Sequence, residues 1–174
     1  MTGPTLPDSQ ALAALVSHVT QTMCGISFEP AGAAAAREVP CWRIATLAID
    51  GARPLLVGLS SNREGCVALG SALFACDPET LDGTMIDDSL CELLNMAAGQ
   101  IKSALALDQM LGLPRIVEEG EQRRMVEMLE REGVVLRSRG TLALLIWVSD
   151  HPPPGKTTQE PTATGREQEE TTRG

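Results

Sequence analysis

Residues 88–99 read DSLCELLNMAAG, and they combine a strong helical pattern with an unusual polar line. Apolar residues recur here, and just outside, at the three- and four-residue spacing of an amphipathic helix with one buried face. The members of this apolar arc are Ile86, Leu90, Leu93, Ala97, Ile101 and Ala104. Four residues fall on the opposite side, so we expect them to face solvent, and we call them the ridge. The ridge consists of Asp88, Glu92, Asn95 and Gly99.

The ridge contains two residues that are poor helix formers. Asn and Gly in the middle of a helix cost roughly 0.5 and 1 kcal/mol relative to Ala. An ordinary exposed face in this chain would carry Lys, Arg and Glu, so Asn95 and Gly99 suggest a requirement other than helix propensity. Spacing alone leaves the plainer interpretation open, which is a solvated helix face.

Composition favours one globular domain and excludes some partners. The 174 residues are 43% hydrophobic, which is enough for a sizeable core. Aromatic residues are limited to Trp42, Trp147, Phe28 and Phe74, so a base-stacking platform is not expected. The net charge of −9 argues against nucleic-acid or anionic-membrane partners, because phosphate binding depends on Lys and Arg.

Cysteine and histidine usage predicts no metal site and no cofactor of the chain's own. The five cysteines are odd in number and form no CxxC pair, so we expect small buried thiols in a reducing compartment. The two histidines, His18 and His151, have no cysteine at metal-ligand spacing. The chain shows no secretion signal and no apolar window of about 18 residues. We therefore expect a cytoplasmic protein.

The first half of the chain predicts a helix and a strand pair. The apolar spacing over residues 7–25 is helical, with Asp8 or Ser9 as its cap. Residues 41–50 and 54–61 predict two strands joined through an Asp-Gly turn as an antiparallel hairpin.

Two capping boxes predict helix starts. Ser61 with Glu64 should open a second helix that ends near Ala75. Thr84 with Asp87 should open the long helix of the ridge.

Downstream of the ridge the pattern weakens. The long helix is expected to continue to about Gln109 and to stop before Gly112 and Pro114. Residues 114–119 are a short strand candidate, and the charged residues 118–132 could form a helix or a loop. Five methionines of this region are predicted to fill the core. They are Met85, Met96, Met110, Met125 and Met128.

The end of the chain predicts a second hairpin and a tail. Residues 133–140 and 141–150 read as two strands with Gly-Thr at the turn, and the second is apolar enough for a central position. Residues 151–174 are poor in apolar side chains and are expected to be disordered. The predicted organisation is one domain over residues 1–150 followed by this tail.

Common catalytic signatures are absent from the sequence. The chain has no phosphate-binding glycine loop, no GxSxG elbow and no HExxH helix. A Ser-His-Asp triad would need His18 or the histidine of the tail.

The ridge resembles the signature of the CheC/CheX/FliY family of chemotaxis phosphatases, in particular its single-site CheX-like members. The shared pattern is Asp88-x3-Glu92-x2-Asn95, followed by Gly99 and later by Pro114. The order of predicted elements also fits over about residues 8–150. Leu94 stands where many relatives carry Gly, and this departure bears on how closely a partner docks. The chain has a single Glu-x-x-Asn motif, which favours a one-site CheX-like protein.

This resemblance implies a specific activity. It implies a phosphatase that accelerates hydrolysis of the aspartyl phosphate of a CheY-like response-regulator receiver domain. Glu92 would pair with the active-site lysine of the receiver, and Asn95 would orient the attacking water. Mg²⁺ would belong to the receiver, and the protein would form a homodimer through its sheet.

Fold and function can therefore be stated as expectations. We expect an α/β domain of the α+β type, in which helices pack on an antiparallel sheet of about five or six strands. Two alternatives to the phosphatase stay open. One is a non-catalytic module that binds a receiver or a flagellar-switch component, and the other is a structural dimerisation domain.

Overall fold

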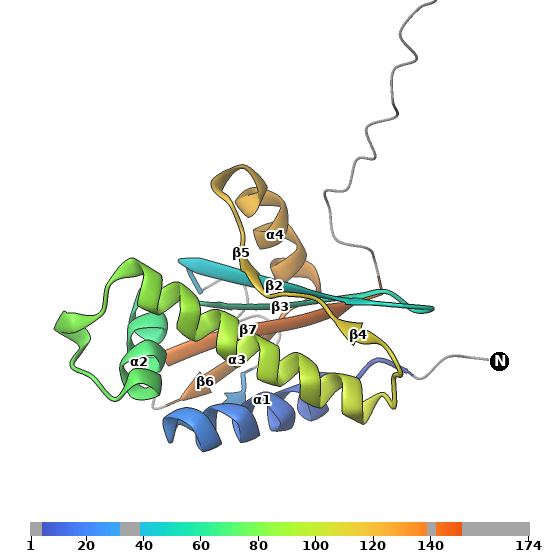
Figure 1. Cartoon of the computed structure of the whole chain (residues 1–174), viewed down its shortest axis with the longest axis horizontal. Coiled ribbons are helices and arrows are strands. Elements are labelled where there is room, and N and C mark those ends of the chain that lie inside the picture. The colour runs from blue at the N-terminus through green and yellow to red at the C-terminus, as the bar shows by residue number, and fades with distance from the viewer. Residues whose placement is uncertain (1–4, 32–38, 139–141, 151–174) are drawn as a thin grey trace, which may run out of the picture.

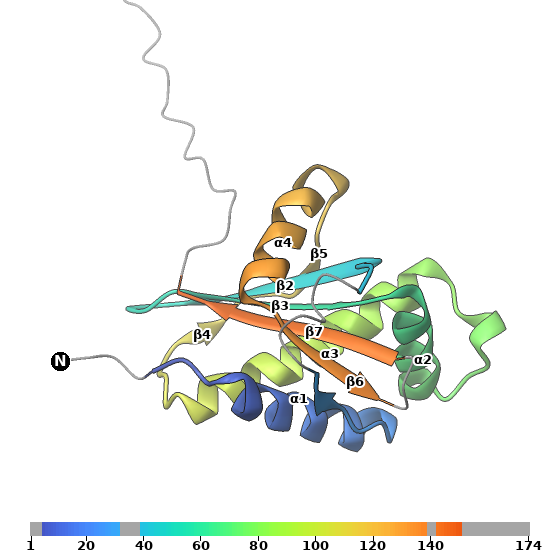
Figure 2. The ribbon, with the colours of Figure 1, turned by 180° about the vertical axis from the view of Figure 1, so that it is seen from behind.

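The computed structural model describes residues 5–31, 39–138 and 142–150. Three helices cover one face of a sheet, and a fourth lies on the opposite face (Figures 1 and 2). The first three are α1 (Ser9–Cys24), α2 (Arg63–Phe74) and α3 (Gly83–Ala104), and the fourth is α4 (Glu119–Glu132). A 3₁₀ turn, η2 (Pro78–Thr80), links α2 to α3.

The sheet of the described residues has seven strands, and all their pairings are antiparallel. They are β1 (Glu29–Pro30), β2 (Arg43–Asp50), β3 (Leu55–Ser61), β4 (Met110–Leu111), β5 (Arg115–Ile116), β6 (Val134–Ser138) and β7 (Leu142–Ser149). Their spatial order is β1-β6-β7-β3-β2-β4, and β5 also pairs with β2. The predicted α/β class with an antiparallel sheet is confirmed. The number of strands exceeds the predicted five or six. The sheet includes β1, β4 and β5, which have only two residues each and are too short to show a clear sequence pattern.

Alternation along the strands divides the core between the two faces of the sheet. On β7, Leu144 and Ile146 face α1 and α3, whereas Leu145 and Trp147 face the side of α4. Trp147 lies opposite Gly58 on β3, and a Cβ added at Gly58 would come within 1.8 Å of the indole ring. Only glycine leaves room for this ring, so the largest core side chain depends on its cross-strand partner.

Both predicted capping boxes are wrong by one or two residues. Asn62 caps α2 and Asp82 caps α3, each by accepting the backbone N–H three residues ahead. Ser61 cannot serve as a cap because it ends β3 and its hydroxyl donates to the backbone of β7. Thr84 lies within the first turn of α3.

The end of α3 also differs from expectation. The helix ends at Ala104 rather than near Gln109, because Ala106 adopts a left-handed conformation with φ of 50°. Gln109 is instead buried under the β2–β3 turn, where a Cβ at Gly51 would approach its side chain to 2.5 Å.

The remaining helices follow the sequence closely. Asp8, one of the two predicted caps, begins α1, and Gly25 ends it with φ of 66° at the close of the predicted range. The charged segment left open between helix and loop is α4, which buries Met125 and Leu129. Within the described residues, none of the helices is long and apolar enough to cross a bilayer. The predicted turn at Gly140-Thr141 and the tail lie outside the described residues.

Candidate functional site

The ridge lies on α3, and the opposite side of this helix fixes its position. Leu90, Leu93 and Ile101 are at most 1% exposed and pack into the core against the sheet. The predicted apolar arc is confirmed except for Ala104, which is exposed at the last position of the helix. A helix held by this many buried side chains presents its outer residues in a fixed orientation.

The four ridge residues differ in exposure. Asp88 and Glu92 are exposed, whereas Asn95 and Gly99 are half-buried. Among the described residues, neither the Glu92 carboxylate nor the Asn95 amide makes an ion pair or a side-chain hydrogen bond. Their i, i+3 spacing puts both groups on the same side of the helix. The Glu92 carboxylate, which accepts hydrogen bonds, and the Asn95 amide, which accepts and donates them, are therefore available to another molecule.

Contacts at both ends hold α3 against the outer edge of the sheet. Near its start, Asp87 accepts a hydrogen bond from Arg43 Nε of β2 at 2.9 Å. Near its end, Leu111 of β4 lies beside Gly99, with its Cδ1 4.0 Å from where a Cβ would stand. Asp87 thus forms an ion pair with Arg43 of β2 and does not form the predicted capping box with Thr84. Glu92 and Asn95 lie between these two attachment points.

Cations gather beside the start of α3. The Arg43 guanidinium lies 4.5 Å from the centre of the Trp42 ring, and that of Arg63 lies 5.6 Å from it. Such cation–π contacts hold both cations close to the surface around the indole. Sequence reasoning missed this cluster because Arg63 comes from α2, beyond the hairpin that carries the other two residues.

Burial makes the thiols of four of the five cysteines harder to deprotonate. Burial raises the pKa of the Cys66 thiol to about 12, and burial also raises the pKa values of Cys24, Cys41 and Cys91. A thiol with a raised pKa carries little thiolate at neutral pH. All five cysteines are free, and the described residues contain no group of three His, Cys, Asp or Glu placed to hold a metal.

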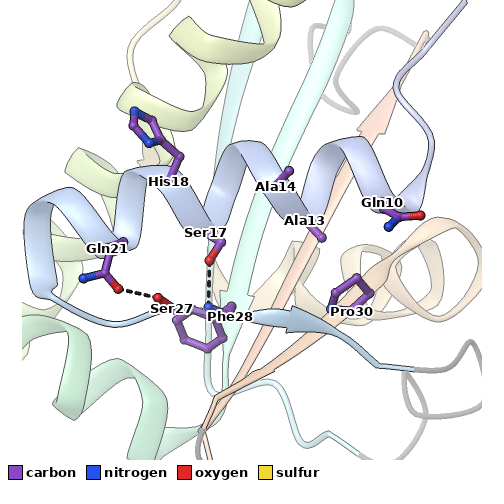
Figure 3. Close-up of a pocket in the computed structure, with 9 residues that line it drawn as sticks. All are labelled: Gln10, Ala13, Ala14, Ser17, His18, Gln21, Ser27, Phe28 and Pro30. Atoms are coloured by element: carbon purple, nitrogen blue, oxygen red, sulfur yellow. Dashed lines mark hydrogen bonds between the residues drawn. The ribbon is translucent and has the colours of Figure 1, made fainter.

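A cavity of about 460 Å³ lies elsewhere, between α1 and β1 (Figure 3). It includes His18, but no Asp or Glu is among the described residues that line it, so no Ser-His-Asp triad forms there. The Ser17 hydroxyl accepts the Phe28 N–H at 2.9 Å, and the Ser27 hydroxyl donates to the side chain of Gln21 (Figure 3). These polar groups connect α1 to the edge of the sheet.

Comparison with protein families gives one match. The model of the family described as chemotaxis phosphatase CheX matches residues 43–137, which is more than half of the chain. The matched region runs from β2 into β6 and contains the whole ridge. No significant match is found among curated protein sequences.

Comparison with solved structures supports the same fold. A CheX–CheY–BeF₃–Mg²⁺ complex from Borrelia burgdorferi is similar with a TM-score of 0.60 and 13% identity, over 83% of this chain and 98% of that one. CheX from Vibrio vulnificus is similar with a TM-score of 0.55 and 14% identity, over 79% of this chain and 93% of that one. CheX from Desulfovibrio desulfuricans is similar with a TM-score of 0.54 and 13% identity, over 79% of this chain and 96% of that one. At these identities the likeness shows the fold.

Proposed function

The chain belongs to the CheX chemotaxis phosphatase family, and from this premise we propose that it accelerates hydrolysis of the aspartyl phosphate of a CheY-like receiver domain. The observation that carries the proposal is the ridge. From one side of an anchored helix it presents a carboxylate and a carboxamide that have no side-chain partner among the described residues. The structure of the Borrelia burgdorferi relative, which contains CheY, supports the class of partner.

The roles of the two side chains follow from their chemistry. Hydrolysis of an acyl phosphate depends on an in-line water more than on a strong base. The Asn95 amide oxygen can accept a hydrogen bond from that water, and its NH₂ group can donate one to the phosphoryl group, so Asn95 acts by positioning. Glu92 carries a negative charge that would pair with the lysine of the receiver's active site. We therefore propose Asn95 and Glu92 as the catalytic residues.

The receiver would supply the remaining charge stabilisation. We propose that Mg²⁺ is held by the receiver and that this chain contributes no cofactor of its own. The Borrelia burgdorferi complex contains Mg²⁺ together with CheY, which supports this division. A metal ion bound by the substrate protein can stabilise the charge on the phosphoryl oxygens.

Two further properties belong to the proposal. A cytoplasmic location fits the proposed receiver substrate, and a homodimer fits the expectation from the family. Light scattering on the purified protein measures the mass in solution and decides between monomer and dimer.

The decisive experiment measures phosphate loss from receivers. Each receiver domain of the source organism is phosphorylated with a small-molecule donor, the donor is removed, and decay is followed with and without the protein. We expect at least one receiver to decay faster with wild-type protein and at its own rate with Asn95→Ala. If every receiver keeps its own rate, the enzymatic proposal fails. Binding without any change in rate would instead indicate the non-catalytic receiver-binding module.

A further inference from the structure

The segment after α3 holds two large apolar side chains in water. Met110 is 79% exposed and Leu113 is 90% exposed. In the part of the chain that the structure describes, the only other large apolar residue classed as exposed is Phe74, at 41%. The prediction that Met110 fills the core is therefore wrong. We call Met110 and Leu113 the apolar tip.

Backbone contacts hold this segment in place. β4 pairs with the end of β2 and β5 pairs with its first half, so both sides of the tip are attached to one strand. Between them the Gly112 N–H donates to the Ala48 carbonyl at 2.7 Å. A Cβ on Gly112 would lie 2.9 Å from that oxygen, so the close approach depends on glycine. These backbone contacts fix the conformation in which the Leu113 side chain is exposed.

The apolar tip borders the ridge. Leu111, which precedes Gly112, packs on the core and reaches Gly99 at the end of the ridge. β4 and β5 run along the outer flank of α3, on the side away from α1 (Figure 1). The segment that carries Leu113 therefore lies beside the surface that a body bringing an acyl phosphate to Asn95 would approach.

From these observations we propose that the apolar tip is the anchor on which the receiver domain rests when it engages the ridge. This inference rests on the proposed function above. Interfaces concentrate their energy in a few apolar residues next to polar groups that fix orientation. Here Leu113 provides the apolar part, and Glu92 with Asn95 provides the polar part. Met110 follows the alternation of β4 and points to the opposite face of the sheet from Leu111, so the contact with the receiver is assigned to Leu113.

The backbone of the segment argues against a second copy of this chain as the occupant. Extending the sheet into a partner needs a run of outward N–H and C=O groups. Pro114 has no N–H, the Gly112 N–H is already bonded to Ala48, and β4 and β5 are two residues long. The tip therefore offers side chains rather than a regular strand edge.

The test separates docking from chemistry. The probe is the receiver that the wild-type protein dephosphorylates, loaded with Mg²⁺ and beryllium fluoride for binding and with phosphate for turnover. If the wild-type protein dephosphorylates no receiver, the probe is the receiver that, when loaded with Mg²⁺ and beryllium fluoride, binds the wild-type protein most tightly. We expect Leu113→Asp to raise the Kd and the KM about tenfold or more, with kcat at saturation within twofold of wild type. Leu113→Met should retain the wild-type Kd, because it keeps the apolar volume.

Phe74→Ser is the matched control, since it removes an exposed apolar side chain from α2 and should leave the Kd unchanged. An unchanged Kd for Leu113→Asp, in a protein whose Asn95→Ala variant still loses turnover, overturns this inference and leaves the proposed function standing. A change of mass by light scattering without a change in Kd assigns the tip to a contact between copies and also overturns it. If the wild-type protein neither binds nor dephosphorylates any receiver, both proposals fail together.

Discussion

Helices α1 and α3 lie side by side on the same face of the sheet, and they are alike in almost everything that burial controls (Figure 1). Each is amphipathic, each packs into the same core, and each is capped by an aspartate that accepts a backbone N–H at 2.8 Å. Their outer sides differ. The ridge of α3 carries two acids, an amide and a glycine, whereas α1 shows small and neutral residues, among them Ala14 and Gln21.

The difference indicates where the function of this fold is encoded. The buried positions of both helices are fixed by packing and cannot distinguish them. Only the outward positions are free to specify chemistry. Two helices with equivalent packing can therefore differ in function, so that one carries a site and the other does not. The neighbours add to the contrast, because α3 has the apolar tip beside it and α1 has β1. Substitutions on the two helices can therefore be paired, with α1 as the reference wherever it offers a match.

The largest expected effect comes from the carboxamide. Asn95→Asp keeps the size of the side chain but replaces the amide donor with a negative charge facing the phosphate. We expect the accelerated rate of receiver dephosphorylation to fall by about 100-fold, as for the loss of a positioned donor. Gln21→Glu on α1 makes the same chemical change and should leave the rate within twofold. Equal effects of the two changes would remove the distinction between the helices.

The carboxylate comes next. We expect Glu92→Ala to weaken binding of a beryllium fluoride receiver about tenfold and to slow turnover, because a charge-assisted contact contributes roughly 1.5–3 kcal/mol. Titration calorimetry and initial rates measure the two effects. Glu130→Ala removes another exposed acid, from α4 on the other face of the sheet, and should change neither the affinity nor the rate. A similar loss in both variants would mean that net charge, rather than position, governs binding.

A glycine exchange between the helices separates stability from docking. The structure leaves room for a Cβ at Gly99, so Gly99→Ala should raise the free energy of unfolding by about 1 kcal/mol while weakening receiver binding several-fold. Ala14→Gly on α1 should lower stability by a similar amount and leave binding unchanged. Urea titration and the same binding assay suffice. Tighter or equal binding by Gly99→Ala would show that close approach by a partner is not what the glycine provides.

The smallest effects are expected at the caps. Asp8→Ala and Asp82→Ala each remove one side-chain acceptor and should each cost about 1 kcal/mol of stability. Neither should change the rate of dephosphorylation more than twofold, since the Arg43–Asp87 pair still attaches the start of α3 to β2. Thermal melts and initial rates measure both. A large loss of rate confined to Asp82→Ala would show that the ridge depends on its first turn.

Much of this arrangement could be predicted from periodicity. The α3 helix, the β2–β3 hairpin and the central position of β7 follow from spacing and apolar content, because those patterns reflect burial directly. The caps could not be placed as well, since Ser61 satisfies the local pattern but is already used by the sheet. Met110 departs from its predicted place in the core for a related reason, because apolar character alone does not show which apolar side chains remain exposed.

The chemistry of the ridge was set by the sequence alone, through the choice of Glu92 and Asn95 three residues apart on one helical face. Their orientation needs only the 3.6-residue repeat, which is a local property of the backbone. The surroundings of the ridge were decided by tertiary structure, since β4, β5 and the apolar tip exist only where β2 offers an edge to pair with. A two-residue strand has too few local contacts to form by itself, so its position depends on distant residues that folding brings beside it.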